Sequence, residues 1–421
     1  MKVLKFGGSC IDKMDRIWRI LKEEKEEKIV VVSALPEVTD ELYLSFPSRD
    51  VEGLRERHIA MVERMDAGEE HKKAMISRME QMLSNAKRAE SLDAFVSYGE
   101  RLSAMLLERY LNSKGMRATV LESDSLPLVT DESGEILLEE CTNVNKRIKE
   151  EIMKGSIPII TGYFGIDEKG SIKTLGRGGS DYTASAISYL TDAEAVELWK
   201  DTQGFMSADP RIVERAHLIE ELSYEEAAEL AHYGAKILHP RAIEPAVKKG
   251  IRIFVKSIDD HSAKGTLISD KTGEKAKIRA ISCRKGVKIL KFSIPGLAYT
   301  RMPGKIIDDH YRGGDLIYAI STSQASLALL VDENCEERAE EIKPMRIENV
   351  ALIATVGYDI GMTPGISADV FLSMKKEGIN ILMISEGASD SAINFVVAGE
   401  ECDRAVKALH RDLIEVKNGN E

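Results

Sequence analysis

The sequence has 421 residues, enough for two or three domains, and its hydrophobic content of 43% is ordinary for a globular protein. Its 58 basic and 70 acidic side chains give a formal net charge of -12, which argues against a nucleic-acid partner but leaves small anionic substrates open. No apolar run approaches the roughly 18 residues that cross a bilayer, so no membrane partner is expected. The five cysteines are scattered and form no C-x-x-C pair, which favours a reducing, cytoplasmic compartment.

Short apolar strands alternate with helical stretches over the first 268 residues. Residues 3–6 predict a strand rather than a signal peptide, and residues 29–33 form a β-branched run of the kind that is buried on both faces of a sheet. Further strands are expected at 118–122, 157–161, 194–199 and 252–256, and helices at 14–28 and within 51–113. This alternation predicts a three-layer α/β fold.

The first strand runs into a glycine turn, Lys5-Phe6-Gly7-Gly8-Ser9. The lysine and two glycine amides could hold the β- and γ-phosphates of a nucleotide. The turn is not a P-loop, because its lysine precedes the glycines. An ordinary turn at a strand end is an equally good interpretation of these residues alone.

A second glycine-rich stretch, Thr174-Leu-Gly-Arg-Gly-Gly-Ser-Asp-Tyr-Thr-Ala184, leads into a helix-compatible run. Its glycines allow close approach of a ligand to the backbone, and the helix N-terminus favours an anion. Arg177 could fork onto a carboxylate or a phosphate. Glu100 follows Gly99 at another expected helix start, where a glutamate often only complements the helix dipole.

Two further polar segments follow strands or helices. Residues 198–211 read as a strand and a long loop that ends in Asp-Pro-Arg, and such loops bind ligands in α/β sheets. Phe205 could stack on a base or belong to the core. In residues 234–240, Lys236 could reach a phosphate or lie on the surface, and His239 before a proline is expected to be structural.

The chain changes character near residue 268. Residues 269–277 are polar and predict a linker. Beyond them, Pro303-Gly304 and Pro364-Gly365 open two segments with a helix, a turn and a strand in the same order. Two copies of one small α+β unit are the economical interpretation.

Taken in order, these motifs closely resemble aspartate kinases, which belong to the amino acid kinase family and carry C-terminal ACT regulatory modules. The resemblance covers nearly the whole chain. It implies a catalytic domain at 1–268, a linker with the first regulatory strand at 269–285, and two ACT-like βαββαβ modules at 286–345 and 346–421.

The resemblance also implies a role for each motif residue. At the phosphoryl end would lie Lys5, Gly7, Gly8 and Ser9, with Ser180 and Asp181 at the reacting centre. Ser33 and Thr39 would line the substrate end, where Glu100 receives the α-ammonium of aspartate and Arg177 its α-carboxylate. The nucleotide would be framed by Lys200, Asp201, Phe205, Asp209 and Arg211, with Lys236 near its phosphates. No residue is assigned as a metal ligand.

The implied reaction is ATP- and Mg²⁺-dependent phosphorylation of the side-chain carboxylate of L-aspartate, the first step toward lysine, threonine and methionine. A homodimer or homotetramer with lysine or threonine as effector is expected. The chain departs from the family pattern at Ser9-Cys10, Lys200 and Phe205, where Thr-Ser, threonine and tyrosine are usual. Two alternatives stay open: a kinase of another amino acid or acid, and a non-catalytic amino-acid sensor with a degenerate kinase domain.

Overall fold

The computed structural model describes residues 1–234, 237–270, 277–293, 301–312, 316–335 and 344–415. The chain forms two compact units. The first comprises Met1–Gly204 and Leu238–Asp270, and the second comprises Phe205–Ile237 and Lys271–Glu421. The expected linker at 269–277 lies mostly outside the described residues.

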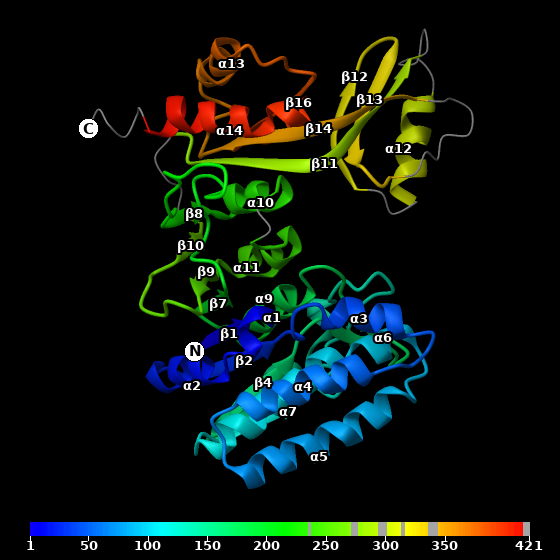
Figure 1. Cartoon of the computed structure of the whole chain (residues 1–421), viewed down its shortest axis with the longest axis vertical. Helices are drawn as coiled ribbons and strands as arrows, with labels where there is room; N and C mark the ends of the chain where they lie inside the picture. The colour runs from blue at the N-terminus through cyan, green and yellow to red at the C-terminus, as the bar shows by residue number, and fades with distance from the viewer. Residues whose placement is uncertain (235–236, 271–276, 294–300, 313–315, 336–343, 416–421) are drawn as a thin grey trace. The chain divides into compact units, whose positions relative to one another are not determined.

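A mixed sheet forms the middle layer of the first unit, in the order β3-β4-β2-β1-β7-β9-β10 (Figure 1). Its strands are β1 (Lys2–Phe6), β2 (Lys28–Val32), β3 (Ala118–Leu121), β4 (Ile157–Thr161), β7 (Ala195–Lys200), β9 (Arg252–Ser257) and β10 (Thr266–Ser269). Adjacent strands from β3 to β9 are parallel, and β10 is antiparallel to β9. Because β1 pairs with β2 on one side and β7 on the other, the strand order reverses at β1, and such a switch point favours a ligand at the carboxyl ends of the strands.

Helices cover both faces of this sheet. Several lie within the stretches that the sequence predicts as helical, but the first long one ends at Glu23 rather than at residue 28, because Lys28 already pairs in β2. The helices are α1 (Gly8–Ile11), α2 (Met14–Glu23), α3 (Val38–Ser45), α4 (Glu52–Arg64), α5 (Glu69–Ala86), α6 (Leu92–Val96), α7 (Tyr98–Ser113), α8 (Val144–Met153), α9 (Gly179–Thr191) and α11 (Glu244–Lys249). A small hairpin of β5 (Phe164–Ile166) and β6 (Ile172–Thr174) stands beside them.

Successive side chains of β1 point to opposite faces of the sheet. Leu4 and Phe6 are fully buried in the core cluster that includes Leu106 of α7. Lys5 therefore points to the opposite face, where its ammonium meets Asp181 of α9. A charged residue in the middle of an apolar strand is thus directed to the helix whose N-terminus carries the glycine-rich motif.

The second unit is built on an antiparallel sheet in the order β12-β13-β11-β14-β16-β15 (Figure 1). Its elements are β8 (Glu221–Ser223), α10 (Tyr224–His232), β11 (Ala280–Ser293), α12 (Met302–Arg312), β12 (Ile317–Thr322), β13 (Ser326–Asp332), β14 (Met345–Val356), α13 (Ile366–Glu377), β15 (Met383–Ser385), β16 (Ala392–Ala398) and α14 (Cys402–His410). Strand, helix, strand and strand follow one another twice, from β11 to β13 and from β14 to β16, which confirms the predicted repeat. The two copies share one sheet because β11 pairs with β14.

Residues 205–237 belong to the second unit, although the sequence interpretation includes them in the catalytic domain. Ala208 and Val213 pack in a core cluster with Ile353 and Phe395 of the central strands, which explains the assignment. Within the described part of the chain, no helix is long and apolar enough to cross a membrane.

Candidate active site

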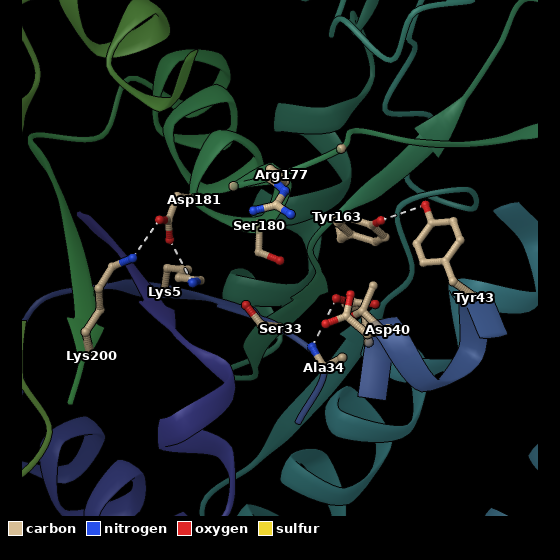
Figure 2. Close-up of a pocket in the computed structure, with 15 residues that line it drawn as sticks. Lys5, Ser33, Ala34, Asp40, Tyr43, Tyr163, Arg177, Ser180, Asp181 and Lys200 are labelled. Atoms are coloured by element: carbon tan, nitrogen blue, oxygen red, sulfur yellow. Dashed lines mark hydrogen bonds and ion pairs between the residues drawn. The ribbon is translucent and has the colours of Figure 1, made fainter. Parts of the chain in front are cut away.

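A cavity of about 490 Å³ opens at the carboxyl ends of β1, β2 and β7 (Figure 2). It lies entirely within the first unit. Its lining comprises Lys5, Ser33, Ala34, Thr39, Asp40, Tyr43, Glu100, Tyr163, Gly176, Arg177, Gly178, Gly179, Ser180, Asp181 and Lys200. Eight residues of the predicted site share this one cavity: Lys5, Ser33, Thr39, Glu100, Arg177, Ser180, Asp181 and Lys200.

One end of the cavity is defined by a buried carboxylate between two lysines. Asp181 Oδ1 lies 2.7 Å from Lys5 Nζ, and Asp181 Oδ2 lies 2.8 Å from Lys200 Nζ (Figure 2). The Asp181 side chain is only 5% exposed. Burial alone would raise the pKa of Asp181, but the two ammonium groups outweigh it and hold the pKa well below its usual range. The group carries two cations and one anion, so it presents net positive charge to a ligand.

The same burial acts on Lys5 in the opposite sense. Burial lowers the pKa of Lys5, and the nearby ammonium of Lys200 adds to this, while Asp181 counteracts both. The carboxylate is therefore what keeps a cation at this position. An anionic phosphoryl group arriving here would meet the lysines at fixed positions.

The glycine-rich motif forms the turn into α9. Gly178 is the N-cap residue with φ of 73°, and Gly176 has φ of 72°, a region that favours glycine. A Cβ on Gly178 would lie 2.3 Å from the Cβ of His239, so this position has no room for a side chain. The helix begins at Gly179 rather than near Ala184, so Ser180 and Asp181 occupy its first turn. Arg177 is exposed between the glycines and turns its guanidinium into the cavity (Figure 2).

Glu100 is a buried acid at the cavity wall, 2% exposed. The amide of Ala34 donates to its Oε1 at 3.0 Å, while its Oε2 has no hydrogen-bond partner among the described residues. Burial raises the pKa of Glu100 to about 8, against smaller opposing effects of backbone amides and of Lys5. Gly99 makes this placement possible, because a Cβ there would lie 2.8 Å from that of Ala34. An unpaired, buried carboxyl oxygen at a cavity wall suits a cationic ligand.

Helix α3 supplies the wall beside Glu100. Thr39, Asp40 and Tyr43 line the cavity from this helix, and Tyr163 faces them from the segment after β4. Of these four residues, the sequence analysis singled out Thr39 alone. Asp40 directly follows Thr39 in the sequence and could have been found from that neighbour, whereas nothing in the local sequence marks either tyrosine.

Comparison with known proteins identifies the family of this chain. The sequence model of the amino acid kinase family matches residues 1–257, and that of the ACT domain matches residues 353–413. Aspartokinase 1, chloroplastic, of Arabidopsis thaliana is 30% identical over 98% of this chain and 80% of its own length. The chain belongs to the aspartokinase branch of the amino acid kinase family.

Solved aspartokinases share the whole architecture. Lysine-sensitive aspartokinase 3 of Escherichia coli is 29% identical, with 98% of this chain and 99% of the relative covered. The structure of E. coli aspartokinase III in complex with aspartate and ADP matches with a TM-score of 0.82 at 28% identity over 98% of this chain and 99% of that chain. The aspartate kinase of Clostridium acetobutylicum gives a TM-score of 0.82 at 26% identity over 98% and 100%. The predicted fold of an amino acid kinase domain followed by ACT-like modules is therefore confirmed.

Within this aspartokinase fold, the glycine turn after β1 departs in one detail from its expected role. The amide of Gly7 donates to the carbonyl of Trp199 at 3.0 Å, which extends the pairing of β1 with β7. The Gly7 amide is therefore already engaged in a hydrogen bond, and we no longer expect it to bind a phosphate. Gly8 and Ser9 begin α1, whose first amides have no intrahelical acceptor. Cys10 donates its thiol to the same carbonyl at 3.2 Å and is buried, which raises its pKa to about 11.

The residues expected to frame the nucleotide do not all lie in one unit. Asp201 belongs to the first unit, whereas Phe205, Asp209 and Arg211 belong to the second. Phe205 is 1% exposed, which is a core position and not an open stacking face, so its role as a base platform is revised. Asp209 and Arg211 pair with each other, with 2.7 Å between Oδ2 and Nη2. Lys236 lies outside the described residues.

Glu100 makes a pH-dependent contribution to stability that can be measured. Its pKa rises from 4.5 in an exposed carboxyl to about 8, so the folded protein retains a proton that the unfolded chain has lost. The contribution of protonated Glu100 to the free energy of unfolding is fully present below pH 4.5 and is lost as the pH rises through about 8. Between these values, Glu100→Gln should gain stability relative to the wild type by up to about 1.4 kcal/mol per pH unit.

Urea unfolding of both proteins at pH 5 and pH 8 checks this, because all other titrating groups are common to the pair. Parallel pH profiles of the two proteins would show that Glu100 is ionised in the folded chain.

Proposed function

We propose that the chain transfers the γ-phosphoryl group of ATP to the side-chain carboxylate of L-aspartate, giving L-4-aspartyl phosphate. The observation that carries this proposal is that one cavity holds two chemically distinct sets of groups. Lys5, Asp181 and Lys200 form a cationic group at one side, while Glu100 and Arg177 add one acidic and one basic group. An α-amino acid with an acidic side chain complements both sets.

Each group of the substrate has a counterpart in this cavity. The free Oε2 of Glu100 would accept the α-ammonium, which would favour the ionised carboxylate and lower the pKa of Glu100. Arg177 would bind the α-carboxylate through two parallel hydrogen bonds. Ser33, Thr39 and Ser180 line the cavity between, so the side-chain carboxylate would extend toward Lys5.

The chemical step needs little from the protein beyond position and charge. One oxygen of the substrate carboxylate attacks the γ-phosphorus, the bond to the β–γ bridging oxygen breaks, and ADP leaves with the electron pair. The attacking carboxylate is already ionised, so no general base is required. Lys5 and Lys200 stabilise the negative charge on the transferred group, and Asp181 fixes their positions.

Mg²⁺ would enter with the nucleotide. Among the described residues, no group of three histidine, cysteine or acidic side chains could hold a metal ion, and Asp181 is engaged by two lysines. This donor set fits an ion held chiefly by phosphates and water, which is the common mode for Mg²⁺. When bound, the ion would neutralise further phosphate charge.

Two alternatives have less support. A substrate without an α-ammonium would leave the buried Oε2 of Glu100 without a partner. A non-catalytic sensor would have no need for Asp181 and two lysines in a buried ion-paired group. The charged residues of the predicted site are all present in one cavity, which favours an active aspartate kinase.

Lys5→Ala should lower kcat by about 10²- to 10³-fold, as expected when one donor to transition-state charge is removed. An assay that traps the acyl phosphate from ATP and aspartate as a hydroxamate measures this. Lys2→Ala is the matched control, because Lys2 is on the same strand and pairs with Glu24 outside the cavity. A Lys5→Ala enzyme as active as the control would refute the assigned phosphoryl end, and a wild type that yields no hydroxamate would refute the reaction.

We further propose that the second unit mediates self-association and binds an amino-acid effector. Strands β12 and β15 are the edges of its sheet, and they expose Ile320 at 42% and Ile384 at 45%. Exposed edge strands with apolar side chains are most simply covered by a second copy. Lysine is the first effector to test, because the similar E. coli enzyme is named as lysine-sensitive, with threonine as the alternative.

Light scattering should give a dimer or tetramer, and Ile384→Lys should shift it toward the monomer. Millimolar lysine should inhibit the wild type, through a coupling free energy of about 1–3 kcal/mol. A monomeric wild type, indifferent to lysine and threonine, would contradict both parts of this proposal.

A further inference from the structure

Two tyrosines join opposite walls of the cavity at the end remote from the lysines. The hydroxyls of Tyr43 and Tyr163 lie 3.0 Å apart, within hydrogen-bonding distance. Figure 2 shows this pair on one side, Lys5, Asp181 and Lys200 on the other, and Arg177 with Ser180 between them. The pair therefore stands behind the position assigned to the α-carbon of the substrate.

Tyr163 is held in an unusual backbone conformation. Its φ of 75° lies in the left-handed region, which is unfavourable for a bulky residue. The backbone is fixed on both sides: its amide donates to Thr183 Oγ1 at 3.2 Å, and its carbonyl accepts from the Leu175 amide at 2.7 Å. Backbone strain of this kind is kept only where surrounding contacts hold the residue in place, and it is common at ligand sites. Here the two hydrogen bonds hold Tyr163 at the cavity wall.

Tyr43 belongs to helix α3, whose first turn has no side-chain cap and whose outer residues are exposed. Helix α3 is preceded by Glu37 at φ of 64°, and no side chain caps its first turn. Its residues Leu44 and Tyr43 are 83% and 39% exposed. The same helix contributes Thr39 and Asp40 to the cavity. A hydrogen bond from Tyr43 to the fixed Tyr163 thus ties this helix to the opposite wall.

The pair also fits a barrier made of neutral groups. Burial raises the pKa of Tyr163, and the hydrogen bond with Tyr43 raises it further, so the phenol keeps its proton at ordinary pH. The two rings, joined through their hydroxyls, form one side of a cavity that also holds six ionisable side chains: Lys5, Asp40, Glu100, Arg177, Asp181 and Lys200. The Tyr163 phenol offers no charge to attract a second carboxylate.

We propose that the Tyr43–Tyr163 pair is the back wall of the amino-acid site and sets the length of the acidic side chain that the enzyme accepts. This inference rests on the proposed function. An amino acid with one more methylene, anchored by its carboxylate at the lysines, would push its α-carbon toward the two rings. In hydrophobic pockets, one methylene typically changes kcat/KM by about 10- to 200-fold, and we expect discrimination at or below the lower end of that range against these two rings.

The test uses Tyr43→Phe, Tyr163→Phe and the double variant of the full chain. Each single variant should raise the KM for aspartate by about 3- to 10-fold, the effect of one lost hydrogen bond. The double variant should be no worse than either single variant, because both remove the same bond. The KM for ATP should stay unchanged, and the preference in kcat/KM for aspartate over glutamate should fall in all three.

Tyr189→Phe is the matched control. Its hydroxyl donates to Glu139 Oε1 at 3.2 Å on the surface of the same unit, so it loses a comparable bond outside the cavity. It should leave both KM values and the aspartate preference as in the wild type. Thermal unfolding of all variants, expected within a few degrees of the wild type, identifies effects that are only structural.

The outcomes separate the two proposals. A wild type inactive with aspartate would refute the proposed function and, with it, this inference. A wild type active with aspartate, whose variants show additive losses, equal changes in the KM for ATP, or an unchanged preference over glutamate, would overturn this inference alone.

Discussion

The buried carboxylate of Asp181 is the interaction on which the active site depends. Two lysines that converge on one point repel each other, and burial disfavours the charged form of Lys5. Asp181 counteracts both effects by forming an ion pair with one ammonium on each of its oxygens, at 2.7 and 2.8 Å. Strand β1 and helix α9 must therefore keep a fixed separation, and the glycine turn before α9 lets the helix begin early enough to supply this aspartate.

Opposite charges are kept apart along the rest of the cavity. Glu100 is buried and accepts a hydrogen bond from the Ala34 amide, with its other oxygen unpaired among the described residues, while Lys5, Asp181 and Lys200 form a separate ion-paired group (Figure 2). A substrate with an ammonium and two carboxylates complements both sets of charges at once. Selectivity for an acidic amino acid then follows from the placement of charges, and the tyrosine pair adds a limit on length.

The sequence predicted the fold in its main elements because buried parallel strands have a distinctive apolar composition. It also predicted the two repeated α+β segments, which together form one sheet. Lys5, Glu100, Arg177 and Asp181 were found through their motifs, since glycines mark the turns that bring them together. Tyr43 and Tyr163 were missed because they are 120 residues apart in the sequence, and no motif around either residue indicates a ligand site.

Other errors have equally local causes. The sequence could not show that the Gly7 amide is used by Trp199, because that bond depends on the register of β1 and β7. Nor could it show that Phe205 is buried, since a lone aromatic beside a polar loop is compatible with both core and ligand contacts. Residues 205–237 are a different case, because they fall within the family match to residues 1–257 while their apolar side chains pack with strands of the second unit.

The most direct test of this account is single-turnover phosphoryl transfer by Asp181→Asn, with aspartate affinity measured in parallel by calorimetry. The asparagine keeps the shape of the side chain but removes the charge that holds both lysines. The account predicts a fall in the transfer rate of at least about 10²-fold, which exceeds any weakening of aspartate binding caused by the loss of the ordered lysines. Transfer at close to the wild-type rate would contradict it.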